Sequence, residues 1–244
     1  MVDTVPDLAV LVLAVVLDLA VGELPARFHP TVWMGRTVAF GEKLAPRNGL
    51  AGMAAGGVLA LLAAGLWAAA AYFAVRGLHG VHDVAYVLVG AVLLKTTFSL
   101  RMLHRAAAWV SGLLALGDIT QARCDLRSLV SRDTSGLSPK QAAAAAVESV
   151  SENVTDSFIG PWLFFALFGL PGAVAYRTVN TLDSMIGYHG EYEHLGKVSA
   201  RLDDLLNLVP ARLAGLLIVF GSLFLPGQRA RGAWRIMWRD HSRT

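Results

Sequence analysis

The sequence has few charged residues and almost no cysteine. Charged residues make up 16% of its 244 residues and hydrophobic residues 55%, whereas about a quarter of a soluble domain is charged. The single cysteine, Cys124, excludes an intrachain disulfide and a cysteine metal cluster. In hydrocarbon only a helix or a closed barrel satisfies its own backbone, so the long apolar stretches predict membrane helices.

Several common functional motifs are also absent. We find no P-loop, no GxGxxG turn, no HExxH pair and no Gly-x-Ser-x-Gly elbow. A nucleotide would therefore bind by a less common architecture. The basic residues are scattered without an aromatic stripe, so the pI of about 9.2 does not favour nucleic acid as a partner. Residues 1–7 lack the positive region of a secretory signal, which predicts that the first apolar helix is retained.

The apolar stretches predict an all-α, polytopic membrane bundle of about five helices in a single domain over residues 1–244. The clearest stretch, residues 50–75, carries no charge and is long enough to cross a bilayer with tilt. The other candidate spans are residues 84–100, residues 158–179, and the shorter runs 8–17 and 213–225. Each of the two short runs is long enough to cross the membrane only if its flanking residues belong to the same helix.

The distribution of Lys and Arg predicts which connections face the cytoplasm. Residues 22–49, residues 101–156 and the tail from residue 226 are rich in Lys and Arg. Simple alternation of the spans then places residues 180–212 on the opposite side. We expect Gly169-Leu170-Pro171-Gly172 to break residues 158–179 into two short helices that dip in and return. Both polar segments would then share the cytoplasmic face of the plasma membrane.

Acidic residues recur every four positions at Glu148, Glu152 and Asp156. On a continuous helix they form one stripe, and like charges at that spacing repel. A bound cation explains the arrangement, and Mg²⁺ is the natural candidate because it takes carboxylate oxygens together with substrate phosphates. The alternative is a solvated helix face.

Other polar residues have two interpretations. Pro30 holds His29 extended, which presents its imidazole as a base or ligand, or else His29 is an interfacial loop residue. Arg201 either binds a phosphate or forms an exposed pair with Asp204. The remaining amide, hydroxyl and acidic candidates are Asn153, Asn180, Asp183, Ser184, Asp203 and Asn207, of which Asn180 shares a helical face with Asp183 and Ser184.

Several motifs together resemble those of one protein family. They are Glu148-Ser-Val-Ser-Glu-Asn153, Asn180-Thr-Leu-Asp-Ser-Met-Ile-Gly-Tyr188, Ala200-Arg-Leu-Asp-Asp204 and Pro210-Ala-Arg212, with upstream matches at Asp18, His29-Pro30, Lys95, Gly117-Asp118 and Arg132-Asp133-Thr134. Over nearly the whole chain the sequence resembles the adenosylcobinamide-phosphate synthases of cobalamin biosynthesis. Members of that family continue for several tens of residues past the segment like residues 234–242, so the resemblance implies that a C-terminal portion is lacking here.

The resemblance implies a membrane-bound ligase that uses ATP and Mg²⁺. Such enzymes join adenosylcobyric acid to aminopropanol or aminopropanol O-phosphate, giving adenosylcobinamide or its phosphate. The implied partners are this corrinoid acid, the amine, membrane lipid and later membrane enzymes of the cobalamin pathway. A carboxylate is a poor electrophile, so an acyl phosphate is the expected intermediate, and phosphoryl transfer depends on positioning and charge neutralisation.

The roles expected of the candidate residues follow from this reaction. We expect Glu148, Glu152 and Asp156 to bind Mg²⁺. We expect Asp183, Asp203 or His29 to accept the proton that the incoming ammonium loses. The residues expected to bind substrate and phosphate are Lys95, Arg132, Asn153, Asn180, Ser184, Arg201, Asn207 and Arg212. Two rival hypotheses remain. Lys95 and Arg177 are charges within predicted spans, as in a transporter or channel, and a catalytically silent relative would keep the same scaffold.

Overall fold

The computed structural model describes residues 4–80, 82–130, 133–188, 190, 192–225 and 229–239, and the regular structure in these ranges is entirely helical. The α-helices are α1 (Thr4–Ala20), α2 (Pro30–Leu44), α3 (Gly49–His79), α4 (Asp83–Lys95), α5 (Leu100–Ala115), α6 (Ile119–Leu126), α7 (Pro139–Val154), α8 (Gly160–Ile186), α9 (Lys197–Gly221) and α10 (Ala230–Arg239). A 3-10 turn, η1 (Ala26–Phe28), precedes α2, and a π-helical turn, η2 (Thr155–Ile159), joins α7 to α8. The all-α prediction is confirmed.

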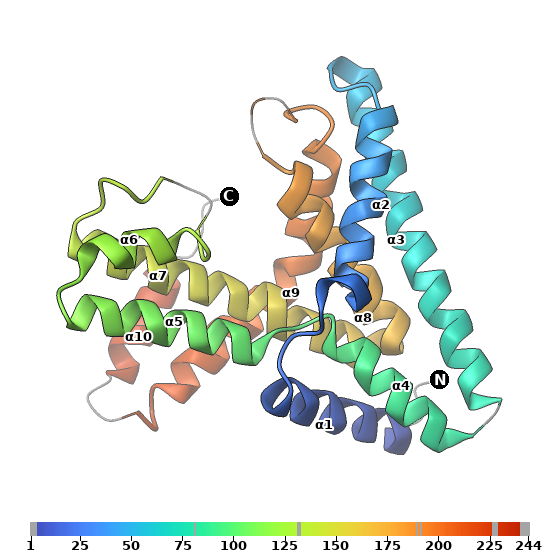
Figure 1. Ribbon diagram of the computed structural model, residues 1–244, viewed down its shortest axis with the longest axis horizontal. Coiled ribbons are helices and arrows are strands. Elements are labelled where there is room, and N and C mark those ends of the chain that lie inside the picture. Colours follow the sequence, from blue (N-terminus) through green and yellow to red (C-terminus); the bar gives the residue numbers. More distant parts are fainter. Residues whose placement is uncertain are drawn as a thin grey trace.

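Helix α8 is central to the packing (Figure 1), where it contacts α2, α3, α4 and α9. Helix α1 packs along α4, and α5, α6 and α7 form a separate lobe at the other side of the molecule. The largest core joins α1, α4 and α8 through buried residues that include Val10, Tyr86, Leu94, Phe165 and Leu170. The central helix is therefore fixed from several sides, which matters because it carries part of the site.

Helix α3 has the surface expected of a helix in lipid. Its buried residues are all small: Gly52, Gly56, Ala60, Ala63 and Ala71. Large side chains such as Leu61, Leu66 and Phe73 are more than half exposed. A water-soluble protein buries such side chains, whereas lipid tails are as apolar as they are. The span predicted for residues 50–75 is confirmed as the middle of this helix.

Four helical stretches in the described residues are long and apolar enough to cross a membrane: Gly49–His79, Asp83–Ala115, Pro139–Ile186 and Lys197–Gly221. The prediction of about five spans is close, and the protein is a multi-pass membrane protein. The second stretch is interrupted after Lys95, where α4 ends, and the hydroxyls of Thr96 and Thr97 donate to the carbonyls of Leu93 and Leu94 in its last turn. Residues 197–212, which the charge distribution assigns to a connection, instead begin the 25-residue helix α9.

The third stretch turns back on itself inside α8. Gly169 has φ 66° and ψ −162°, a conformation outside the helical region, and Pro171 follows it. Beyond this break the two arms pack together: Phe164 stacks on Tyr176 at 5.0 Å between ring centroids, and a Cβ on Gly160 would lie 2.2 Å from the Tyr176 ring. In a straight helix the sixteen steps from residue 160 to residue 176 would span about 24 Å. The predicted break is confirmed, and the chain forms a helical hairpin.

Candidate functional site

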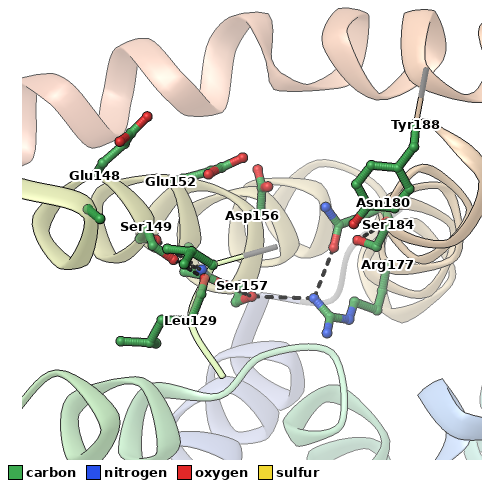
Figure 2. A pocket seen from close by; sticks show the side chains of 13 residues that line it. Leu129, Glu148, Ser149, Glu152, Asp156, Ser157, Arg177, Asn180, Ser184 and Tyr188 are labelled. Carbon is green, nitrogen blue, oxygen red and sulfur yellow. Dashed lines mark hydrogen bonds between the residues drawn. The ribbon is translucent and has the colours of Figure 1, made fainter. Parts of the chain in front are cut away.

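A cavity of about 370 Å³ lies where α7, η2 and the second arm of α8 meet. Figure 2 shows its side chains, which come from segments on both sides of the hairpin. The lining residues are Leu129, Val130, Ala145, Glu148, Ser149, Glu152, Asn153, Asp156, Ser157, Arg177, Asn180, Ser184 and Tyr188. This lining is strongly polar for a membrane protein, and polar groups within a membrane bundle mark functional sites.

The carboxylates of Glu148, Glu152 and Asp156 form a row along one edge of the cavity (Figure 2). The helix that carries them starts at a capping box, in which Ser138 and Gln141 satisfy each other's backbone N–H groups, and Pro139 occupies the first turn. The π-helical turn η2 continues α7 without a break, so Asp156 follows the same edge. Such turns occur frequently at functional sites. The predicted acidic stripe is therefore present.

This row is too spread out to hold a metal ion by itself. Within the part of the chain that the structure describes, no three His, Cys, Asp or Glu side chains are grouped so that they could hold one. Mg²⁺, however, keeps several waters and uses one or two carboxylates together with substrate phosphates. The row fits a metal that arrives with a phosphate, and Mg²⁺ on Glu148, Glu152 and Asp156 stays a prediction.

The second arm of α8 supplies the facing wall of the cavity. Arg177 Nη1 donates to Asn180 Oδ1 at 3.1 Å and to Ser157 Oγ at 3.4 Å. The bond to Ser157 ties the second arm of α8 to η2, whereas the bond to Asn180 lies within the second arm. Asn153, on α7, also lines the cavity, and its Nδ2 donates to the carbonyl of Ser149 at 2.9 Å.

A second group of polar residues lies next to the cavity on α9. Asp203 accepts a hydrogen bond from Asn207 Nδ2 at 2.8 Å, and Asn207 Oδ1 accepts one from the Tyr176 hydroxyl at 2.6 Å. Asp183 and Asp203 are close enough to Asp156 for their charges to interact. Neither carboxylate lines the cavity itself. The acidic field of the site therefore extends from α7 to α9.

A buried charge network lies beside the cavity around Glu23. Its Oε2 accepts hydrogen bonds from Lys95 Nζ at 2.9 Å and from His29 Nε2 at 3.0 Å, and its Oε1 accepts one from Ser99 Oγ at 2.7 Å. Lys95 also lies 3.6 Å from Asp18 Oδ1. Burial alone would raise the pKa of Glu23, but these hydrogen bonds and the charge of Lys95 lower it to about 2. The Ser99 backbone N–H donates to the Ser157 carbonyl and joins the network to the cavity wall.

Comparison with known proteins identifies the family. Residues 11–244 match the family model described as CobD/Cbib protein. The chain belongs to the CobD/Cbib family. Among its curated relatives, the cobalamin biosynthesis protein CobD of Dehalococcoides mccartyi is 45% identical over 97% of this chain and 77% of its own length. The protein of the same name in Geobacter metallireducens is 47% identical over 95% and 73%, and that of Klebsiella pneumoniae 40% over 92% and 72%. No solved structure shows a significant match to the chain.

The site residues predicted for this CobD/Cbib family member fall into three places. Glu148, Glu152, Asn153, Asp156, Asn180 and Ser184 line the cavity. Asp183, Asp203 and Asn207 lie beside it on α8 and α9, and His29 and Lys95 belong to the Glu23 network. His29 has extended backbone, as its position before Pro30 predicts. No role of these residues is tested by their positions, so the roles stay predictions.

Two of the three predicted arginines, Arg201 and Arg212, lie outside the cavity lining. Arg201 is exposed and lies 3.7 Å from Asp204, which matches the alternative interpretation of an exposed pair. Arg212 is exposed and donates to the carbonyl of Leu208 one turn earlier in α9. Arg132 lies outside the described residues.

Sequence reasoning missed several residues that the structure brings to this site in the CobD/Cbib chain. Arg177, Ser157 and Tyr188 line the cavity, and Glu23 organises the neighbouring network. Arg177 had a signal, because it is a charge within an apolar run, but that signal equally suits a transport path. Glu23 had none, since two of its three hydrogen-bond partners, Lys95 and Ser99, lie 72 and 76 positions away.

Proposed function

We propose that this protein catalyses the ATP-dependent formation of an amide bond. The bond joins adenosylcobyric acid to aminopropanol or aminopropanol O-phosphate. Its relatives are named cobalamin biosynthesis proteins, and the family resemblance implies this step. The observation that carries the proposal is the cavity in which a row of carboxylates faces amide and guanidinium groups across the hairpin. Such a site suits a reaction that handles a metal-bound triphosphate, an anionic acid and an ammonium together.

The proposed reaction has two balanced steps. A carboxylate oxygen of the corrinoid acid attacks the γ-phosphorus of ATP, and ADP leaves with the electrons of the broken P–O bond. The amine nitrogen then attacks the acyl carbon, phosphate leaves, and the nitrogen loses a proton. When bound, Mg²⁺ would neutralise charge on the phosphates. Glu148, Glu152 and Asp156 are proposed to hold it.

The proton of the ammonium requires a base near the attacking nitrogen. Asp183 and Asp203 are the proposed acceptors because their charges reach the cavity from α8 and α9. His29 is less suited to this role, because its Nε2 is already engaged by Glu23. We further propose that the cavity faces the cytoplasm of the plasma membrane, where ATP is available, and that later cobalamin-pathway enzymes bind the same membrane face.

The direct test uses the reconstituted protein with ATP, Mg²⁺, adenosylcobyric acid and each amine. Mass spectrometry should find the condensed amide together with one ADP for each amide formed. A strain that lacks the gene should grow on cobinamide and fail on cobyric acid. The proposal is wrong if the wild-type protein turns over neither amine, or if the strain grows on both corrinoids. Substrate flux across liposomes without ATP turnover would favour a transporter instead.

A further inference from the structure

Arg177 is the one basic side chain among the described residues that line the cavity. It lies on the second arm of the hairpin and is partly buried there. The other charged lining residues are the three carboxylates of the acidic row. Among the described residues, an anionic group that enters this cavity without a metal therefore meets one basic side chain, that of Arg177.

The hydrogen bonds of Arg177 leave one side of its guanidinium without a partner. Nη1 donates to the neutral oxygens of Asn180 and Ser157. Nε is buried and has no hydrogen-bond partner. Among the described residues, neither a hydrogen bond to Nη2 nor an ion pair of Arg177 is formed. Buried N–H donors without acceptors are rare in native proteins and each requires an explanation.

The unpartnered donors have the geometry of a binding site for two oxygens. The Nε–H and Nη2–H groups lie along one edge of the planar guanidinium and point in parallel, which matches the oxygen pair of a carboxylate or phosphate. We propose that Arg177 binds a substrate oxyanion, a carboxylate or phosphate, through this edge. Asn180 and Ser157 hold Nη1 from the other side and so fix the orientation of the edge before the substrate arrives.

The other candidate cations are committed elsewhere. Lys95 is buried and shared between Glu23 and Asp18, so its charge is already neutralised. Arg201 and Arg212 are exposed on α9 and outside the cavity lining. Among the described residues, Arg177 thus combines a position in the cavity with free donors.

This inference rests on the proposed function, which supplies the possible oxyanions: the corrinoid carboxylate, the phosphates of ATP and the phosphate of the amine. Arg177→Lys keeps the charge but loses the paired donors, and Arg177→Gln loses both. In the reconstituted protein, we expect KM for one oxyanion substrate to rise about 10- to 100-fold in Arg177→Gln. Arg177→Lys should give a smaller rise for the same substrate, and the KM values of the others should stay within twofold.

The substrate whose KM rises identifies the oxyanion. A rise with aminopropanol phosphate but none with aminopropanol assigns the amine's phosphate, whereas a rise for the corrinoid acid or for ATP assigns those groups. Arg76→Gln is the matched control, because Arg76 is at the far end of α3 and donates to the Tyr72 hydroxyl. The inference is wrong if every KM of both Arg177 variants stays within twofold of wild type, whatever happens to kcat.

Two further measurements separate the possible failures. If the wild-type protein forms no amide, the proposed function fails, and Arg177 is then tested by equilibrium binding of adenosylcobyric acid, ATP and inorganic phosphate without turnover. Wild type should bind one of them at least tenfold more tightly than Arg177→Lys, and equal affinities overturn the inference. Elution as a single species in detergent establishes that each variant is folded, and if Arg177→Gln is not, Arg177→Lys decides the question.

Discussion

At the residue scale, the network around Glu23 places three polar partners on one carboxylate. Lys95, His29 and Ser99 all donate to Glu23. Removal of one member of a buried ion pair leaves the other charge uncompensated, which costs more than the pair contributed. The Glu23 side chain is therefore expected to matter for stability even though it lies outside the cavity.

We expect Glu23→Gln to lower the free energy of unfolding by about 3 kcal/mol at neutral pH. The pKa of Glu23 is lowered from 4.5 to about 2, so its contribution is complete above about pH 4.5 and is lost as the pH falls toward 2. The stability difference between wild type and Glu23→Gln should accordingly be constant above pH 4.5 and shrink below it. Denaturation in detergent at a series of pH values measures this difference. A difference that grows as the pH falls would contradict the assignment.

The acidic row gives a second prediction for single residues. Glu152→Gln should raise the Mg²⁺ concentration for half-maximal amide formation at least tenfold, because a neutral amide is a weaker ligand for a hard cation. Asp83→Asn is the control, since Asp83 is an exposed residue at the start of α4. Titration of Mg²⁺ at saturating ATP checks the effect. An unchanged Mg²⁺ dependence in Glu152→Gln would mean that the row is a solvated face.

At the scale of elements, the hairpin in α8 depends on the backbone of Gly169. Its φ of 66° with ψ of −162° falls in a region that is essentially restricted to glycine. We expect Gly169→Val to destabilise the protein by about 3 kcal/mol and to abolish amide formation, because the two arms would no longer meet. Gly65→Val on α3 is the control, since Gly65 has open space where a Cβ would lie. Melting temperature and product yield should fall for Gly169→Val alone.

Most elements could be predicted from the sequence, whereas the way they meet could not. Residues 50–75 and the helix from Pro139 follow from apolar length and capping chemistry. The break at Gly169 follows from its proximity to Pro171. The end of α4 at Lys95 was missed, because neither Gly nor Pro marks it between residues 95 and 100. The start of α9 was missed because it carries acidic residues. In the sequence alone, such residues on a helix that packs against α8 cannot be distinguished from those of a loop.

For the site, too, local patterns could be predicted from the sequence and contacts between distant segments could not. The spacing of Glu148, Glu152 and Asp156 is local, so a helical pattern reveals it. Arg177 beside Ser157 depends on a contact between residues 20 positions apart, which only the hairpin creates. Lys95 as a phosphate ligand stays a prediction, and its pairing could not be predicted because its partners Asp18 and Glu23 lie 77 and 72 positions away.

At the scale of the whole molecule, the hairpin predicts that both of its ends emerge on one side of the membrane. In a background with Cys124→Ser, cysteines at Ser151 and Tyr188 should react with a membrane-impermeant maleimide from the same side. A cysteine at Phe168, near the turn, should react from neither side. Leu50, at the start of α3, and His82, which lies three residues past its end, provide the control and should label from opposite sides. Labelling of Ser151 and Tyr188 from opposite sides would separate the two walls of the cavity and remove the site.

The small residues buried along α3 have a consequence for how this protein tolerates change. Insertion into a bilayer requires only that a segment be apolar, whereas contact with the chain beside it requires room: a Cβ on Gly56 would lie 1.8 Å from the Leu195 carbonyl oxygen. A polyleucine segment in place of α3 would therefore insert as well as the natural one and yet be unable to assemble with the rest of the protein. Hydropathy alone, as a measure of acceptable substitutions, would rank such a non-functional variant above the native sequence.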